Sequence, residues 1–374
     1  MRGPFWLEEE APPFVASSWA GPPEVVVVGG GVTGCSCAYA LARAGVRVRL
    51  HETREVASGA SGRNGGFALR GGAMGYDEAR QTLGRERARG LWRLTERALD
   101  RLGAAAGDAF VRTGSLRLAA DVAEREELLA EYQALREDGF AAEWRDELAP
   151  PLAGRFAAAL HHPPDGSLQP ARWVRRLAGF AAAAGADLRE RSRLDSLADA
   201  GEAQLVVATD GYTGGLVPEL DAVVRPTRGQ VVITEPLRER LFPSPHYARQ
   251  GFDYWQQTPD RRLVVGGRRD ASLDTEWTAE EATTPLIQDH IEKLVRELVG
   301  KSPAITHRWA GIFGSTPDRL PLVGRVPGRS RVWAALGYSG HGNVLGFACG
   351  ELVAQAILGR PAPELELFDP ARLL

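Results

Sequence analysis

The stretch that decides the fold is residues 24–52, which read EVVVVGGGVTGCSCAYALARAGVRVRLHE. Its four consecutive valines, Val25–Val28, are typical of a buried parallel strand. A glycine-rich turn follows, and then a helical stretch, Cys35–Ala44, which Gly45 ends. A second strand is expected over Val46–Leu50. The segment is therefore predicted to form one βαβ unit.

The turn of this unit carries a GxGxxG pattern in Gly29, Gly31 and Gly34. The first glycine allows a tight turn, the second lets the backbone approach a pyrophosphate, and the third lets the helix pack close to the strand. Glu52 closes the second strand, where a carboxylate can accept hydrogen bonds from both hydroxyls of an adenosine ribose. The strand, helix and acid together favour dinucleotide binding over an ordinary glycine turn.

Composition narrows the class of protein. A chain of 374 residues suggests two or three domains, and 44% apolar with 25% charged residues is typical of a folded globular protein. A net charge of −3 gives no general attraction for nucleic acid or anionic lipid. No apolar run approaches the ~20 residues that span a bilayer, and the N-terminus lacks the pattern of a signal peptide. We expect a cytoplasmic protein with no membrane span and no nucleic-acid partner.

Cysteine and lysine usage excludes further classes. Three cysteines, Cys35, Cys37 and Cys349, are too few for a disulfide framework or a four-cysteine zinc site, so we expect a reducing compartment and no metal. The only lysines, Lys293 and Lys301, lie in a charged stretch. This placement argues against Schiff-base chemistry, which needs an unprotonated lysine amine.

The order of elements predicts a discontinuous α/β protein. Strands of buried parallel character recur near residues 205 and 331, whereas the insertions between them have an antiparallel and helical character. We assign an N-terminal arm, a cofactor domain and a second domain for the substrate. The arm is 1–23, the cofactor domain is 24–75, 152–221 and 306–374, and the substrate domain is 76–151 and 222–305.

Two loops carry the remaining chemistry. The loop after Glu52 places small residues and backbone amides where they can cross a pyrophosphate and reach a flavin ring, although a flexible linker has a similar composition. Its candidates are Ser58, Ser61, Gly62, Arg63, Asn64, Gly65 and Gly66. The second loop joins the last core strand to the last helix, whose N-terminus can face the polar edge of a flavin. Its cofactor candidates are Gly337, Ser339, Gly340, Gly342 and Asn343.

With these motifs the chain resembles the D-amino-acid oxidase superfamily of FAD-dependent amine oxidoreductases, and within it the γ-glutamylputrescine oxidoreductase-like branch. The resemblance runs from about Trp6 to Gly359. It rests on VVVVGGGVTG, GASGRNGG, DGSLQPARWVRRLA, VVATDGYTGGLVPEL, RPTRGQVVITEPL, LPLVGR and GYSGHGN. This number of motifs in this order is specific for the superfamily and moderately specific for the branch.

The resemblance implies an FAD-binding Rossmann-like domain of the glutathione-reductase type and an antiparallel-sheet substrate domain. It also implies oxidation of a C–N bond, with hydride transfer to flavin N5 and hydrolysis of the imine. The substrate would be a small-molecule amine, and oxygen or an electron carrier would reoxidise the flavin. We take His341, Tyr338 and Tyr254 as catalytic candidates. Tyr254 belongs to an aromatic run that suits either a substrate-pocket wall or ordinary sheet packing.

Three departures from the family's pattern qualify this expectation. Phe313 stands where glycine and D-amino-acid oxidases are expected to hold the substrate carboxylate with an arginine, which favours amines without an adjacent carboxylate. Gly311 stands where some sarcosine oxidases carry a flavin-linking cysteine, so the FAD is expected to be non-covalent. Only Arg189–Gln204 fills the place of the usual β-meander.

Other functions stay open at this stage. A glycine- or sarcosine-type amino-acid oxidase is possible if an arginine such as Arg63, Arg249 or Arg308 reaches the substrate from another direction. A flavoprotein of the same fold acting in RNA modification would need a basic face or an added RNA domain. An NAD-dependent dehydrogenase would lack the two loops. The residues do not choose the amine, the electron acceptor or the oligomeric state.

Overall fold

The N-terminal arm packs on the rest of the chain. The computed structural model describes residues 3–11, 13–14 and 19–374, so the part of the predicted arm at 1–2, 12 and 15–18 lies outside the described residues. Phe5–Leu7 form one turn of 3-10 helix, and Trp6 is buried. The indole Nε1 of Trp6 donates a hydrogen bond to the carbonyl of Asn64 at 2.8 Å. Trp6 of the arm thus contacts the loop that follows Glu52.

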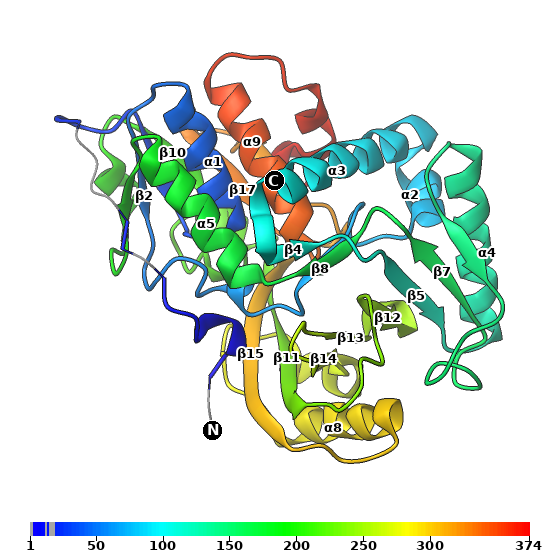
Figure 1. Cartoon of the computed structure of the whole chain (residues 1–374). Helices are drawn as coiled ribbons and strands as arrows, with labels where there is room; N and C mark the ends of the chain where they lie inside the picture. Colours follow the sequence, from blue (N-terminus) through cyan, green and yellow to red (C-terminus); the bar gives the residue numbers. More distant parts are fainter. Residues whose placement is uncertain (1–2, 12, 15–18) are drawn as a thin grey trace.

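A six-stranded sheet forms the cofactor side of the molecule (Figure 1). Its strand order is β16-β17-β10-β1-β2-β9, parallel throughout except for the antiparallel pair β16 and β17. The bounds are β1 Val25–Val28, β2 Val48–His51, β9 Asp187–Arg189, β10 Gln204–Val207, β16 Leu322–Arg325 and β17 Val332–Leu336. Segments far apart in sequence thus share one sheet, as the sequence predicts.

Helices cover one face of this sheet. They are α1 Val32–Arg43, α5 Pro170–Ala183 and α9 Gly342–Ile357, and α1 contacts both of the others (Figure 1). All four valines of β1 are buried, which explains why the strand has no polar alternation. The βαβ unit predicted from residues 24–52 is confirmed, with β2 starting two residues later than expected.

The other face of this sheet is covered by short segments instead of a meander. Between β9 and β10 the chain forms a loop and one 3-10 turn, Leu197–Ala200. Leu194 and Ala200 pack with Val26 and Val28 and other residues in one buried cluster. A few apolar side chains therefore cover the face, and α6 (Pro218–Asp221) adds Leu220 to the same cluster.

The second large sheet has eight strands in the order β15-β11-β14-β13-β12-β5-β7-β6. All neighbouring pairs are antiparallel except β12 and β5. The bounds are β5 Ser115–Ala119, β6 Glu143–Arg145, β7 Ala158–His162, β11 Arg225–Pro236, β12 His246–Ala248, β13 Asp253–Gln257, β14 Arg262–Gly267 and β15 Ile305–Ser315. Two of these strands, β7 and β15, lie in residue ranges assigned above to the cofactor domain. The second sheet therefore includes segments from both assigned domains.

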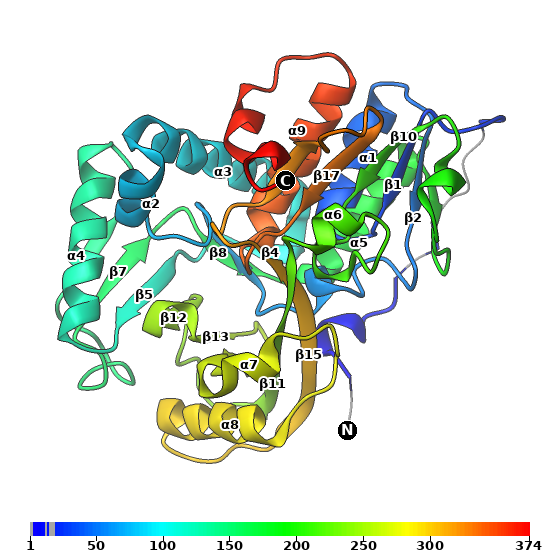
Figure 2. The same cartoon turned by 180° about the vertical axis from the view of Figure 1, so that it is seen from behind.

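Five helices accompany this eight-stranded sheet and lie at its ends and on one side of it (Figure 2). They are α2 Tyr76–Leu83, α3 Arg85–Ala106, α4 Val122–Glu137, α7 Leu273–Glu276 and α8 Pro285–Val299. Gly84, with φ +83°, separates α2 from α3. Helix α8 begins at Pro285, directly after Thr284, whose backbone is extended.

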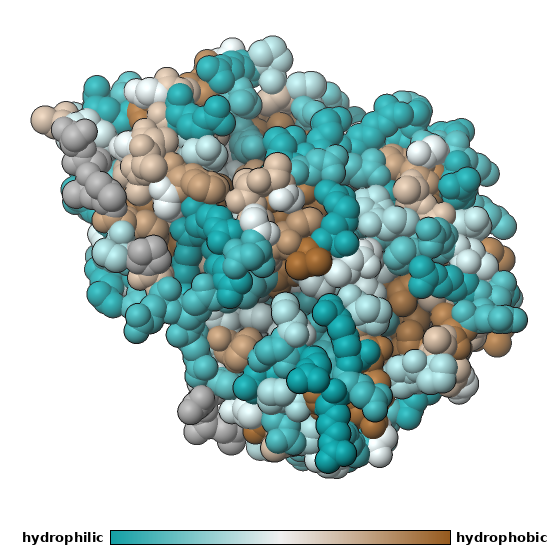
Figure 3. All heavy atoms as spheres, in the orientation of Figure 1, coloured by the Kyte–Doolittle hydropathy of each residue, from teal (hydrophilic) through white to brown (hydrophobic). Residues whose placement is uncertain are grey.

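A third, small sheet joins the two parts. It contains β3 Phe67–Ala68, β8 Gly166–Leu168 and β4 Phe110–Val111. The face of the molecule in Figure 3 is mostly hydrophilic, with small apolar patches between polar side chains. Among the described residues, no helix is both long enough and apolar enough to cross a membrane.

The crossing of α1 and α9 gives a stability prediction. A Cβ added at Gly350 of α9 would meet the carbonyl of Thr33 and lie 2.8 Å from the Cβ of Ser36. Gly350→Ala should therefore lower the free energy of unfolding by about 1–3 kcal/mol. Gly179 in α5 has open space at the same atom, so Gly179→Ala should raise it by about 0.5–1 kcal/mol. Thermal melting of the two variants tests the opposite signs, and equal melting temperatures would contradict the tight crossing.

Candidate functional site

One large cavity lies between the two large sheets. Its volume is about 1160 Å³, above the roughly 300–1,000 Å³ of ordinary small-molecule sites. Of the predicted site residues it is lined by Gly29, Gly31, Glu52, Ser61, Arg63, Asn64, Gly65, Tyr254, Tyr338, Ser339, Gly340, His341, Gly342 and Asn343. Gly34, Ser58, Gly62, Gly66 and Gly337 do not line it. The structure therefore brings both predicted loops and the glycine turn to one place.

The glycine turn has the geometry that close packing requires. Gly29 has φ +110°, and a Cβ there would meet the carbonyl of Ala208 on β10. A Cβ at Gly34 would meet the carbonyl of Gly29, so α1 packs tightly on the turn. At Gly31 a Cβ would lie 2.9 Å from the Oγ of Ser61. The N-terminus of α1 is thus left open to the cavity, as a phosphate-binding turn needs.

Glu52 is held in a fixed orientation directly after β2. Its Oε2 accepts a hydrogen bond from the amide of Gly30 and its Oε1 from the amide of Arg54, both at 2.8 Å. Each carboxylate oxygen keeps a free lone pair, because a carboxylate offers about four acceptor positions. The carboxylate lines the cavity at the α1 end, where the sequence predicts a ribose contact.

Arg63 ties the loop after Glu52 to the second sheet. Its Nε donates to the carbonyl of Ser58 at 2.7 Å and its Nη1 to the carbonyl of Ala310 at 3.1 Å. A Cβ at Gly311, next on β15, would lie 2.9 Å from the Cβ of Arg63. The Trp309 indole also donates to the carbonyl of Arg63 at 2.7 Å. Gly311 is therefore required for the close approach of β15 to this loop.

The two predicted loops are joined by a pair of asparagines. Asn64 Nδ2 donates to Asn343 Oδ1 at 3.0 Å, and Asn343 Nδ2 donates to Asn64 Oδ1 at 3.1 Å. Asn343 Nδ2 also donates to the carbonyl of Phe67 at 2.7 Å. This reciprocal contact fixes the N-terminus of α9 against the loop after Glu52. The two asparagines are 279 residues apart, so the contact could not be predicted from the sequence.

Asp210 is a site residue that the sequence analysis missed. It follows β10, has φ +50° and lines the cavity. Its carboxylate accepts hydrogen bonds from the amides of Gly314 at 3.0 Å and Gly337 at 2.8 Å. Burial raises the pKa of Asp210, and the amide hydrogen bonds oppose that rise. The acid directly after a buried strand, in the stretch ATDG, is the signal that could have found it.

Tyr338 and His341 differ in where their polar atoms point. The hydroxyl of Tyr338 accepts a hydrogen bond from Thr33 Oγ1 of α1 at 3.0 Å, and its side chain is buried. His341 precedes α9, and its Nδ1 is buried with no hydrogen-bond partner among the described residues. Burial lowers the pKa of His341 to about 4, so the imidazole is neutral at physiological pH. His341 therefore has an unused polar atom at the cavity, whereas Tyr338 is engaged by α1.

The far end of the cavity is an aromatic chamber. Tyr254 lies on β13 with its ring edge-on to Phe67, at 6.0 Å between centroids. Burial raises the pKa of Tyr254 to about 12, so its phenol is neutral. Phe252 and Phe313 line the same chamber. The aromatic run is largely strand β13 itself, with Trp255 buried on the opposite side from Tyr254.

A second missed residue, Glu281, lies between α7 and α8. Its carboxylate pairs with Arg54 at 2.8 Å and Arg63 at 3.2 Å, and it accepts a hydrogen bond from the hydroxyl of Tyr212. Burial alone would raise the pKa of Glu281, but these partners lower it overall. The segment between the two helices is thereby attached to the loop after Glu52.

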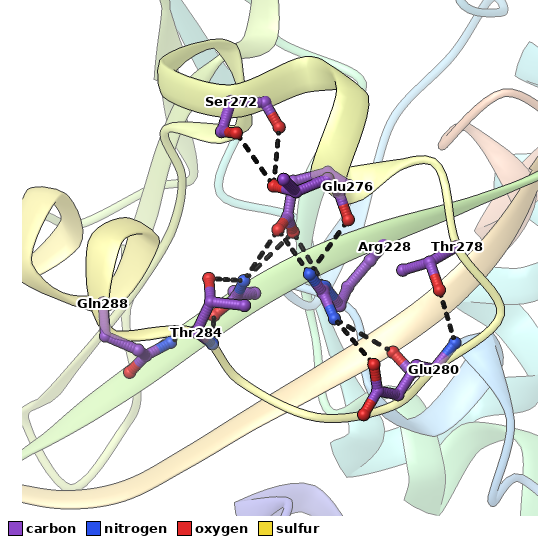
Figure 4. Close-up of polar contacts among 9 residues, drawn as sticks. Arg228, Ser272, Glu276, Thr278, Glu280, Thr284 and Gln288 are labelled. Atoms are coloured by element: carbon purple, nitrogen blue, oxygen red, sulfur yellow. Dashed lines mark hydrogen bonds and ion pairs between the residues drawn. The ribbon is translucent and has the colours of Figure 1, made fainter.

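The same segment is anchored to β11 by a buried ion pair (Figure 4). Arg228 reaches Glu276 through Nη2 at 2.7 Å and Nε at 3.0 Å, and the two side chains are only 3% and 1% exposed. Gln230 Nε2 donates to the same carboxylate, and its Oε1 accepts from the amide of Thr284 at 3.0 Å. A two-pronged, fully hydrogen-bonded pair of this kind holds α7 in one position.

Comparison with known proteins identifies the class. Residues 24–356 match the family described as FAD dependent oxidoreductase. The chain is 28% identical to the probable oxidoreductase OrdL of Rhizobium meliloti, over 98% of this chain and 91% of that protein. It is 28% identical to the gamma-glutamylputrescine oxidoreductase of Escherichia coli, over 92% of this chain and 85% of that protein.

The fold agrees with this class. Glycine oxidase from Geobacillus kaustophilus superimposes with a TM-score of 0.77 and 24% identity, over 95% of this chain and 98% of that one. The chain belongs to the FAD-dependent oxidoreductase family, which confirms the resemblance and the predicted combination of a Rossmann-like domain with a second sheet domain.

The placement of Glu52 gives a binding prediction. If Glu52 binds the adenosine ribose, as the sequence predicts, Glu52→Ala should weaken FAD binding by about 1–3 kcal/mol, because the ribose hydroxyls then lack an acceptor. Glu55→Ala is the matched control, since Glu55 pairs with Arg191 on the surface and does not line the cavity. Titration of the two apoproteins with FAD measures the difference. Equal affinities would place the ribose elsewhere.

Proposed function

We propose that the protein oxidises a C–N bond of a small amine or amino acid with FAD bound non-covalently, and that it does so in the cytoplasm. The substrate class is a small molecule and not a nucleic acid, in keeping with the net charge of −3. The observation that carries the proposal is the single cavity into which the N-termini of α1 and α9 both open, next to an aromatic chamber.

The residues present fit FAD. The positive end of α1, with the amide of Val32 beside Ser61, suits the pyrophosphate, and Glu52 suits the ribose. The positive end of α9, with Ser339 to Asn343, suits the ring edge at N1 and C2=O. None of the cysteines lines the cavity in the described part of the chain, which supports a non-covalent cofactor.

Bound FAD supplies a hydride acceptor for the carbon that bears the amine, and the imine so formed hydrolyses in water. The chain's own residues position the amine and exclude bulk water from the aromatic chamber. Tyr254 and His341 are both neutral and face the cavity, so they can orient a neutral amine by hydrogen bonds. Tyr338 acts as a positioning residue that fixes α9 on α1 through Thr33.

The colour of the purified protein tests both the non-covalent binding of FAD and its reduction by amines. The purified protein should be yellow, and acid precipitation should leave the colour in the supernatant, because no covalent link retains it. Anaerobic addition of amines should bleach the flavin, and admission of air or of a dye acceptor should restore the colour and identify the acceptor type. Colour retained in the pellet contradicts the non-covalent cofactor, and a flavin that no amine bleaches contradicts the proposed reaction.

The pH dependence of flavin reduction should follow the substrate. The rate should rise with pH as the amine loses its proton, because only the neutral amine has a lone pair to assist hydride loss. The pKa of His341 lies at about 4, so this residue does not titrate in the same range. His341→Gln should leave the midpoint of the pH profile unchanged, whereas a substrate with a less basic amine should lower it. A profile that loses its midpoint in the variant would make His341 the titrating group.

A further inference from the structure

One arginine of the cavity has no acidic partner. Seven arginines line the cavity, and six of them form ion pairs: Arg54, Arg63, Arg70, Arg117, Arg193 and Arg319. Arg269 is the seventh, and within the described residues it has neither an ion pair nor a side-chain hydrogen bond. Its neighbourhood is aromatic instead. The guanidinium carbon lies 4.5 Å from the ring centroid of Phe252 and 5.8 Å from that of Phe313.

Two carboxylates, those of Asp270 and Glu276, lie close enough for their charges to act on Arg269, and both are already paired with other arginines. Asp270 pairs with Arg249, and Glu276 pairs with Arg228. Burial lowers the pKa of Arg269, but a guanidinium stays charged in proteins. A half-buried positive charge without a partner is unfavourable, and an anionic ligand in the cavity would remove that cost.

The backbone on both sides of Arg269 is fixed. Before it, the amide of Arg268 donates to the carbonyl of Phe252 at 2.6 Å, and the Arg268 side chain pairs with Asp253 at 2.8 Å. After it, α7 ends in Glu276, which the buried pair with Arg228 holds on β11 (Figure 4). The backbone that carries Arg269 is therefore held in place, and the Phe252 and Phe313 rings flank its guanidinium, so less conformational freedom is lost when a ligand binds.

The position of Arg269 relative to the cofactor loop follows from Phe313. A Cβ at Gly340, in the loop before α9, would lie 3.8 Å from one edge of the Phe313 ring. A Cβ at Gly229 would lie 3.6 Å from the opposite edge of that ring, and Arg269 lies over the ring. The Phe313 ring thus contacts the loop at the proposed flavin edge with one edge and the Arg269 guanidinium with its face.

From these contacts we infer that Arg269 binds a carboxylate of the amine substrate, and that this carboxylate is set apart from the carbon that is oxidised. The inference rests on the proposed function and specifies its substrate class. The three arginines considered from sequence are engaged elsewhere: Arg63 pairs with Glu281, Arg249 with Asp270, and Arg308 with Glu292. Phe313 does not bind the carboxylate itself but offers a ring face to the arginine that does.

A binding experiment on the FAD-loaded protein tests Arg269 without turnover. The probes are pentanoate and its neutral counterpart pentanamide, titrated while the flavin absorbance is followed. Pentanoate should bind the wild type more tightly than pentanamide, and Arg269→Gln should weaken pentanoate binding about 10- to 100-fold while leaving pentanamide unchanged. Arg269→Lys should retain part of the preference, because it keeps the charge but not the planar two-pronged contact.

Arg308→Gln is the matched control, because Arg308 carries the same charge on β15 but does not line the cavity. It should bind pentanoate like the wild type. The inference is overturned if Arg269→Gln binds pentanoate as tightly as the wild type, or if the wild type binds pentanoate no better than pentanamide. The FAD content and circular dichroism of each variant establish that the fold is kept.

Reduction kinetics then locate the carboxylate. The reducing substrates are 5-aminopentanoate, 2-aminopentanoate and pentylamine, added without oxygen. The first should give the highest kcat/KM, and Arg269→Gln should raise its KM at least 10-fold with a smaller change in kcat, leaving pentylamine unaffected. A preference for 2-aminopentanoate would overturn the separation of the carboxylate from the reacting carbon. If no amine reduces the flavin, the proposed reaction fails, while pentanoate binding still decides the role of Arg269.

Discussion

The site depends on one carboxylate at the wall of the cavity, that of Asp210. It stands where β10 of the six-stranded sheet ends, and it accepts hydrogen bonds from the amide of Gly314 on β15 and the amide of Gly337 after β17. One side chain thus ties the cofactor sheet, the substrate sheet and the loop before α9 together. Three buried amides would otherwise lack acceptors, since the amide of Tyr338 also points at this carboxylate at 3.4 Å. The cavity lies at this junction, so its shape depends on the contact.

The sequence predicts the parts of this structure that follow local rules. The valine strand, the glycine turn and the helix after it are specified by residues 24–52, and both predicted loops reach the cavity because each follows a strand of the same sheet. Strand β15 was missed because Gly311 and Gly314 interrupt its alternation. The structure explains both glycines, since side chains there would strike Arg63 and Asp210. Local composition cannot reveal a constraint that comes from a distant segment.

Sequence reasoning missed the features that depend on partners far along the chain. Asn343, for example, was predicted as a cofactor contact, but its hydrogen bond with Asn64 is seen only in the fold. Arg269 looks like one of many arginines in the sequence, and it becomes distinctive because the other arginines that line the cavity have acidic partners. In an arginine-rich chain, the informative property is therefore the absence of a partner among the described residues, which depends on three-dimensional placement.

The charges around the aromatic chamber also favour the reactive form of an amine. His341 and Tyr254 are neutral, so neither stabilises an ammonium ion as a carboxylate would. In the complex proposed above, the substrate carboxylate compensates the charge of Arg269 and fixes the substrate by its far end. Binding energy gained away from the reacting carbon then orients the C–N bond. Correct orientation lowers the barrier of the chemical step and so raises its rate.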